Sequence, residues 1–278
     1  MAFKTILTVV GTETGDADLK LAADLCEEVN AHLSVLVMAL AAPPPIGEYA
    51  AVVSEAWLEE RQADEEKLKA RTEAVSASIA SRAISTDISS TYAEIASADE
   101  AVGRRAHYAD LIVAGPDLLA AGTLKEKVIE GALFSSGKPL LLVPAGSTAT
   151  LNPKRIMVAW DSRFEASRAV HEARPLLAAA QEVRLVLVDP TTGEFQQGGE
   201  PGADAAAYLA RHGAKVTVDR LPREGGSVGD VLRRHAVDTT ADMLVMGAYG
   251  HSRLRERIFG GVTRSMLEEP PLPILLAR

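Results

Sequence analysis

The chain has 278 residues, of which 47% are hydrophobic and 24% charged, and its formal net charge is −9. This length is enough for two domains of ~100–200 residues each, and the composition is typical of a well-packed α/β protein. Aromatic residues make up only 4%, so the core must be built from Val, Leu, Ile and Ala. A single cysteine, Cys26, excludes an intramolecular disulfide and is expected to be a small buried residue.

The negative charge lies in the first half. The first 150 residues hold 12 Lys+Arg against 22 Asp+Glu, whereas the rest hold 17 against 16. An acidic first half would repel a phosphate backbone, so we expect no nucleic-acid partner. No apolar run approaches the ~20 residues of a membrane span, and the N-terminus MAFKTILTVVG is too strand-like for a signal peptide. The sequence therefore predicts a cytoplasmic protein without a membrane partner.

In the first half, short segments rich in β-branched residues alternate with segments of helical periodicity. Strands are expected at residues 4–10, 33–40, 83–89, 110–115 and 138–146. Helices are expected at residues 18–30, 54–82, 97–108 and 123–136. Asp16 or Asp18 is the expected N-terminal cap of the first helix.

The same order recurs in the second half. Strands are expected at residues 155–161, 183–190, 214–221, 243–247 and 273–277, and helices at residues 164–180, 201–213, 227–240 and 258–268. AHYADLIVAG in the first half matches DTTADMLVMG in the second, and KPLLLVP matches LPILLAR. We interpret this as a tandem duplication, with domains at 1–147 and 153–278 joined by the linker GSTATLNPK (146–154).

Unbroken apolar strands alternating with helices predict parallel sheets covered on both faces. We therefore expect two tandem doubly wound α/β domains, each with a five-stranded parallel sheet (Rossmann-like, adenine nucleotide alpha hydrolase-like). Such sheets bind ligands beyond the carboxyl ends of the strands, at the topological switch point. Asp161 and Gly247, which follow the first and fourth strands of the second half, are expected to lie side by side there.

The segment 243–278 carries glycines suited to an anion site. A buried strand leads to a loop with Gly247 and Gly250, and a helix enters at Gly260-Gly261. Glycines let backbone N–H groups close around an anion, and the helix adds the positive end of its dipole. The pattern favours a phosphate cradle. The alternatives are a simple tight turn at Gly247 and a helix cap at Asp161.

Both halves resemble universal stress protein domains, and the whole chain resembles the tandem members of that family. The resemblance rests on AWD (159–161) and VD (188–189) at two strand ends, and above all on MGAYG…FGGVT. The ATP-binding branch has the pattern Gly-x2-Gly-x9-Gly-Ser/Thr. Gly247, Gly250 and Gly260 fit this spacing, but Gly261 stands where the family has Ser or Thr.

The resemblance implies that ATP, with or without Mg²⁺, binds in the second domain. Asp161 and the Val188 backbone would hold the adenosine, above a floor of Met246 and Gly247. The implied site residues are Ala159, Trp160, Asp161, Val188, Met246, Gly247, Tyr249, Gly250, Arg253, Gly260, Gly261, Val262 and Thr263. Because Gly261 has no side chain, the site lacks one hydroxyl donor to phosphate. A hydrogen bond from such a hydroxyl would contribute roughly 0.5–1.5 kcal/mol to binding.

Alternatives remain for several of these residues. Trp160 and Tyr249 would pack beside the base or be partly buried in the core. Arg253 would contact phosphate or be an exposed helix-face arginine. In the first half, Pro116 and Asp117 stand where the second half has Ala248 and Tyr249, and no Trp-Asp pair follows the first strand. We therefore predict no nucleotide in the first domain.

The expected function is that of a nucleotide-dependent regulatory or stress-resistance protein with an adenine nucleotide as partner. We expect no catalytic residue, no resident metal and at most weak ATPase activity. The alternatives are a ligand-free dimerisation and signalling module with a vestigial site, or a slow ATP hydrolase. The apolar last strands, 140–143 and 274–276, would pair edge to edge in a homodimer or an intramolecular pseudo-dimer.

Overall fold

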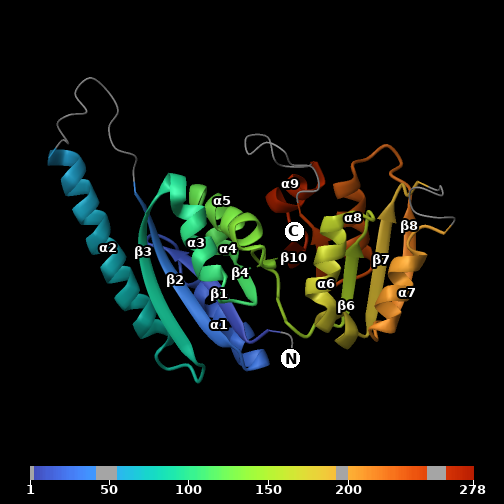
Figure 1. Ribbon diagram of the computed structural model, residues 1–278, viewed down its shortest axis with the longest axis horizontal. Helices are drawn as coiled ribbons and strands as arrows, with labels where there is room; N and C mark the ends of the chain where they lie inside the picture. The colour runs from blue at the N-terminus through green and yellow to red at the C-terminus, as the bar shows by residue number, and fades with distance from the viewer. Residues whose placement is uncertain (1–2, 42–54, 192–199, 249–260) are drawn as a thin grey trace. The chain divides into compact units, whose positions relative to one another are not determined.

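The structure is a computed structural model that describes residues 3–41, 55–191, 200–248 and 261–278 (Figure 1). The chain forms two compact units, a first unit of Phe3–Lys138 and a second unit whose main part is Pro139–Arg278. Each unit is a sheet flanked by helices, so the predicted α/β class is confirmed (Figure 1). No helix within the described ranges is long and apolar enough to cross a membrane.

The first unit has four parallel strands in the order β3-β2-β1-β4. Their bounds are β1 Thr5–Gly11, β2 His32–Ala41, β3 Thr86–Glu94 and β4 Leu111–Ala114. The helices are α1 Ala17–Val29, α2 Glu55–Ile79, α3 Ala98–Ala106, α4 Pro116–Leu119 and α5 Thr123–Glu130. A 3-10 turn at Ile95–Ser97 precedes α3, and a π-helical segment at Gly131–Ser136 continues α5.

The second unit has six strands in the order β5-β10-β9-β6-β7-β8. Their bounds are β5 Leu140–Leu142, β6 Arg155–Ala159, β7 Glu182–Val188, β8 Val216–Leu221, β9 Met243–Gly247 and β10 Ile274–Ala277. The helices are α6 Phe164–Ala179, α7 Ala203–Arg211, α8 Val228–Asp238 and α9 Gly261–Glu268. The order of the parallel strands reverses between β9 and β6, which is the switch point where doubly wound sheets bind ligands.

The last strands of the two sequence halves pair with each other. Leu141 of β5 lies opposite Leu275 of β10 in an antiparallel register, and β10 is parallel to β9 on its other side. Both leucines are fully buried. The predicted pairing of the apolar last strands is therefore confirmed, and it occurs within the chain. Within the second unit, β6 to β10 are mutually parallel, as predicted, and only the pairing of β5 with β10 is antiparallel.

The cores are built from the aliphatic residues that the composition requires. Apart from the terminal strands β3 and β8, the strands of both units are largely buried, and Ile6, Leu7 and Val9 of β1 have no exposed surface. Cys26 of α1 is also fully buried, as expected, and burial raises the pKa of its thiol to about 12. The thiol therefore stays protonated and behaves as a small apolar side chain.

The duplication is visible in individual hydrogen bonds. Asp110, just before β4, accepts bonds from the backbone N–H groups of Lys4 and Thr5 at 2.7 and 3.0 Å. Asp242, just before β9, accepts the same pair of bonds from Lys154 and Arg155 at 2.9 and 2.8 Å. In the first unit one aspartate thus ties the start of β4 to the start of β1, and in the second unit another ties the start of β9 to the start of β6.

Four details differ from the sequence-based expectations. The third strand is β3, residues 86–94, rather than 83–89, and α4 was not predicted. Asp16 occupies the N-cap position of α1 but its side chain makes no capping bond, and Asp18 is engaged elsewhere. The linker 146–154 falls inside the second unit, because β5 already belongs there. The ranges 1–147 and 153–278 remain a prediction of where the two homologous domains begin and end.

Candidate functional site

One cavity of about 350 Å³ opens at the carboxyl edge of the second unit's sheet, within the range of small-molecule sites. It lies at the ends of β6, β7 and β9 and at the first turns of α6, α8 and α9. Its lining residues are Ala159, Trp160, Asp161, Arg163, Glu165, Ala166, Val186, Val188, Val228, Leu232, Met246, Gly247, Gly261, Val262 and Thr263.

Every predicted site residue within the described ranges lines this cavity. The sequence placed Asp161 beside Gly247, and the structure brings both to the same space from neighbouring strands, β6 and β9. Tyr249, Gly250, Arg253 and Gly260 lie outside the described residues.

One wall of the cavity is apolar. Val186 and Val188 alternate on β7, so their side chains point to the same face of the sheet. Val228 and Leu232 come from α8, where the i,i+4 spacing sets them on one side of the helix. Such a wall suits a flat, weakly polar group. The sequence analysis did not identify Val186, Val228 or Leu232. Val186 lies two residues before Val188 at the strand end, and Val228 and Leu232 lie near the start of α8, so this spacing could have indicated them.

The mouth of the cavity is polar. Asp161 accepts a hydrogen bond from the backbone N–H of Arg163 at 3.0 Å, and the Arg163 Nε lies 3.6 Å from its other oxygen. Both side chains are about half exposed. The Trp160 indole donates to the hydroxyl of Ser162, which has a left-handed backbone (φ 63°). Asp161 therefore fixes the turn between β6 and α6 and is not the N-cap residue of α6, which is Arg163.

Gly247 has a packing role that the motif did not reveal. A Cβ at this position would lie 2.5 Å from the backbone nitrogen of Ala166 and from the carbonyl carbon of Glu165. Only glycine therefore lets the end of β9 approach the first turn of α6. This contact places β9, which ends at Gly247, against the first turn of α6, which contains Glu165. Both residues line the cavity.

Gly261 differs from Gly247 in its surroundings. No described atom lies within 4 Å of the position that a Cβ would occupy, and its φ is outside the left-handed region. Gly261, Val262 and Thr263 form the first described turn of α9 and line the cavity. The first N–H groups of a helix are not bonded within it and favour anions. Among the described residues, nothing blocks a side chain at the position that carries a hydroxyl in the ATP-binding branch.

Asp189, the second residue of the VD pair, is held outside the cavity lining. It has a left-handed backbone (φ 46°) and accepts hydrogen bonds from the side chain and backbone of Arg223. These bonds and the charge of Arg223 lower the pKa of the Asp189 carboxyl. Asp189 therefore fixes the loop after β7, and Val188 is the residue that faces the cavity.

The corresponding place in the first unit is occupied by its own chain. Asp18, the second residue of α1, is 1% exposed and accepts hydrogen bonds from the backbone N–H groups of Gly115, Asp117 and Leu118 at 2.9–3.0 Å. Gly115 corresponds to Gly247, since Gly115 directly follows β4 and Gly247 is the last residue of β9. The carboxylate thus takes the backbone donors to which an external anion would bind.

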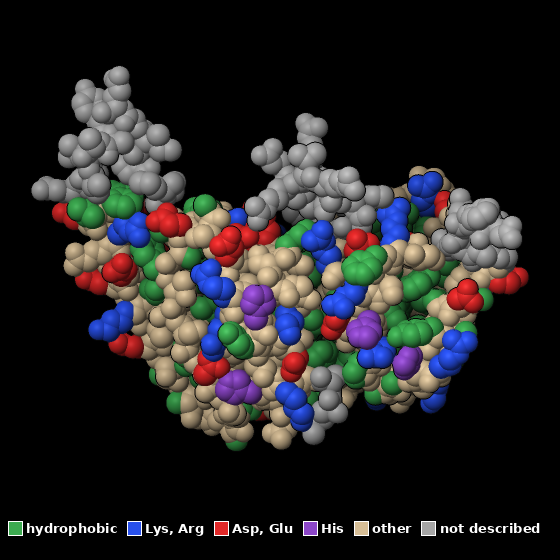
Figure 2. Space-filling model, viewed as in Figure 1, with side chains coloured by type: hydrophobic (Ala, Val, Ile, Leu, Met, Phe, Trp, Pro, Cys, Tyr) green, Lys and Arg blue, Asp and Glu red, His purple; other side chains and the backbone are tan. Residues whose placement is uncertain are grey.

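Charges are dispersed on the surface. On the face shown in Figure 2, basic and acidic side chains are interspersed over the described surface of both units. Within the described ranges, no group of three or more His, Cys, Asp or Glu side chains is placed to hold a metal ion.

The second unit is thus a doubly wound α/β domain with a cavity at the switch point of its sheet. Residues 152–278 match the family described as the universal stress protein family, and the second half of the chain is a domain of that family. The universal stress protein Slr1230 of Synechocystis is 28% identical over 152 residues, a match covering 54% of this chain and half the length of that protein.

Solved structures extend the likeness to the first half. A universal stress protein from Archaeoglobus fulgidus matches with a TM-score of 0.69 and 16% identity, over 98% of this chain and 96% of that one. A protein of unknown function from Pseudomonas aeruginosa PAO1 matches with a TM-score of 0.56 and 15% identity, over 99% and 92% of the two chains. At this identity the likeness concerns the fold, which both halves share with these structures.

Proposed function

We propose that the second domain binds ATP, or another adenine nucleotide, in the cavity between β6, β7, β9 and α9. The observation that carries this proposal is the convergence of Asp161, Val188 and Gly261 on one space. They come from three separate elements and were selected from the sequence because of a nucleotide-binding pattern. The apolar wall suits an adenine ring, and the start of α9 suits phosphate.

The groups at the cavity fit binding better than catalysis. Among its described lining residues the carboxylates are Asp161 and Glu165, and the cation is Arg163. Asp161 is already engaged by Arg163, so it is poorly placed to take a proton from an attacking water. A magnesium ion would arrive with the nucleotide, whose phosphates supply most of its ligands. We therefore propose a nucleotide-dependent regulatory protein whose hydrolysis of ATP, if measured, is slow.

The pairing of β10 bears on the dimerisation alternative. β10 is hydrogen-bonded to β9 on one edge and to β5 on the other, so it has no edge left for a strand of a second chain. Its pairing needs are met within the chain, as in the proposed intramolecular pseudo-dimer. A homodimer would have to use another surface.

The proposal is tested by analysing nucleotides released by heat from the purified protein and by calorimetry with ATP. Asp161→Ala should weaken binding, because it removes the carboxylate at the cavity mouth. Asp204→Ala, on the exposed surface of α7, is the matched control and should bind as the wild type does. Absence of released nucleotide, together with no heat of binding, would refute the proposal.

A further inference from the structure

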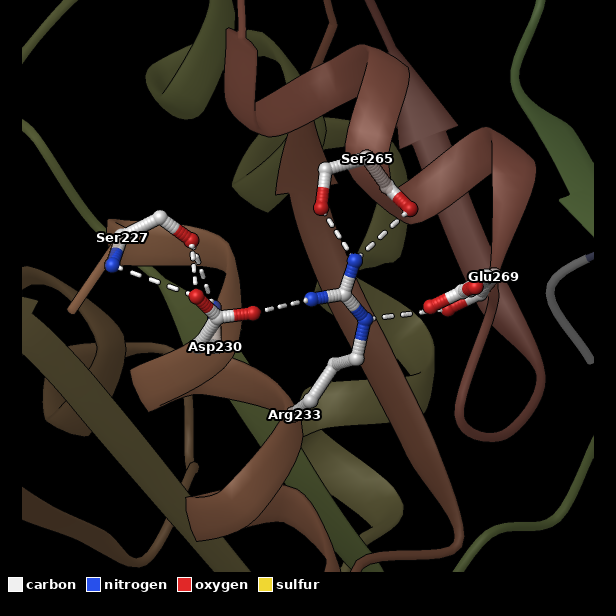
Figure 3. Close-up of polar contacts among 5 residues, drawn as sticks. All are labelled: Ser227, Asp230, Arg233, Ser265 and Glu269. Atoms are coloured by element: carbon white, nitrogen blue, oxygen red, sulfur yellow. Dashed lines mark hydrogen bonds and ion pairs between the residues drawn. The ribbon is translucent and has the colours of Figure 1, made fainter.

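Arg233 joins two helices of the second unit (Figure 3). From α8, its guanidinium pairs with Asp230 on the same helix at 2.9 Å. Its Nε donates to the carbonyl of Glu269 at 3.2 Å, just beyond the end of α9. Its Nη2 donates to the carbonyl of Ser265 at 3.0 Å and also to the Ser265 hydroxyl. The planar, forked guanidinium therefore holds several groups of α9 at once.

The Arg233 side chain is itself held in place by residues of its own helix. Asp230 and Ser227 form a capping box at the start of α8, with the Ser227 hydroxyl bonded to the Asp230 carboxylate at 2.6 Å. These bonds, together with the charge of Arg233, lower the pKa of Asp230, so the carboxylate stays ionised beside the guanidinium. Arg233 is only about one-fifth exposed. Its position is thus fixed from α8, the helix that carries it.

The two helices are also in close contact. A Cβ at Gly229 would lie 2.8 Å from the Ser265 hydroxyl oxygen, so this glycine allows α8 and α9 to approach. α8 contributes Val228 and Leu232 to the cavity, and α9 contributes its first turn. The spacing between α8 and α9 therefore sets the width of the cavity between its apolar wall and its proposed phosphate end.

Arg233 also supplies a positive charge that the last turn of α9 lacks. The last turn of α9 has no basic residue and contains Glu268, which is unfavourable at the negative end of a helix dipole. Arg233 places a cation on the carbonyls near that end from the neighbouring helix. This contact stabilises the orientation in which the opposite, positive end of α9 faces the cavity.

From these contacts we infer that Arg233 is a positioning residue for the ligand site: it acts through α9 and does not touch the ligand. This inference rests on the proposed nucleotide binding. Arg233 is absent from the cavity lining although its neighbour Leu232 is part of it. Its removal should therefore weaken binding by letting α9 shift, while leaving the groups that face the ligand unchanged.

The test compares Arg233→Ala with Arg264→Ala in the full chain. Arg264 is a matched control on α9, because its 2.7 Å ion pair with Glu268 lies within that helix. We expect Arg233→Ala to weaken ATP binding by roughly tenfold and to speed hydrogen exchange of the α9 amides, and Arg264→Ala to change neither. Arg233→Lys, which keeps the charge but loses the fork, should fall between them.

Two results would overturn the inference. One is a folded Arg233→Ala protein that binds ATP as tightly as the wild type. The other is unchanged exchange of the α9 amides in Arg233→Ala and Arg233→Lys. The exchange measurement needs no ligand, so it decides the role of Arg233 even if the wild-type protein binds no ATP and the proposed function fails. If Arg233→Ala does not fold, Arg233→Lys decides with the same two measurements.

Discussion

The carboxylate of Asp18 accepts a hydrogen bond from the backbone N–H of Gly115 at 3.0 Å, at the end of the fourth strand of the first unit. The equivalent strand end in the second unit, at Gly247, opens instead onto a cavity. The two halves of the chain share a fold but differ at this edge. One half supplies its own anion, and the other leaves space for a ligand.

Replacing Asp18 tests how much its hydrogen bonds to the backbone contribute to stability. Asp18→Asn keeps the size of the side chain but substitutes an NH₂ group for one acceptor oxygen, so that at least one of the three backbone N–H donors loses its partner. We expect a loss of about 1–3 kcal/mol in the free energy of unfolding, measured by urea denaturation. Asp24→Asn is the control, because it removes only an exposed ion pair with Arg82. Equal stability of the two variants would show that the Asp18 bonds contribute no more than that surface pair.

The pH dependence of Asp18 has a definite sign. Burial raises its pKa above the ordinary value, although the backbone hydrogen bonds from Leu118, Asp117 and Gly115 oppose the shift. The folded state therefore binds this proton more tightly than the unfolded state, so the contribution of Asp18 to stability declines as the pH rises above about 4. In Asp18→Asn this decline should be absent when unfolding is followed between pH 4 and 7.

Gly247→Ala should destabilise the second unit. The added Cβ would lie 2.5 Å from two backbone atoms of the α6 first turn, which cannot move aside as a flexible side chain can. We expect a cost of about 1–3 kcal/mol in thermal or urea unfolding. Gly226→Ala, where the nearest atom lies at 3.4 Å, is the matched control. A Gly247→Ala protein as stable as this control would contradict the packing role.

Gly261→Ser should tighten ATP binding. No described atom lies within 4 Å of the place that a Cβ would occupy, and a serine there would add a hydroxyl at the start of α9. One additional hydrogen bond is worth about 0.5–1.5 kcal/mol, which corresponds to roughly a 2–12-fold decrease in Kd in calorimetry. Gly261→Ala adds the same Cβ without the hydroxyl and should not reproduce the gain. If alanine and serine act alike, the hydroxyl does not reach the ligand.

Low pH should lower the stability of the second unit, because Asp242 becomes protonated. Burial acts to raise its pKa, but hydrogen bonds from the backbone and side chain of Arg155 and the backbone of Lys154 outweigh it and lower the pKa. The stabilisation is thus present above the ordinary pKa of an aspartate, about 4, and is lost as the pH falls through the lowered value. The stability gap between wild type and Asp242→Asn should therefore be widest near neutral pH and should narrow in acid. A gap independent of pH would contradict this assignment.

The sequence predicted the strands whose burial is continuous. β1, β6 and β9 are nearly unbroken apolar runs and were located within a few residues. β3 was displaced because its sequence TDISSTYAE is polar and half exposed, at the end of the strand order, so no apolar run marks it. The four-residue helix α4 is too short to show a helical period.

Local sequence patterns could not predict strand direction or the contacts between helices that are distant in the sequence. The pairing of the apolar run at Leu140 with the last strand was predicted, but its antiparallel direction was not, since direction is set by the path of the whole chain. The site residues with motif spacing, such as Asp161 and Gly247, were found. Leu232 and Arg233 were not, because their roles depend on how α8 lies against α9.

The most direct test of this account is calorimetric titration of the wild-type chain with ATP. The open cavity of the second unit and the Asp18 carboxylate in the first predict one ATP bound per chain, and Asp161→Ala should weaken that single event. Two equivalents of ATP per chain would contradict the assignment of the first unit, and no binding at all would contradict the central claim.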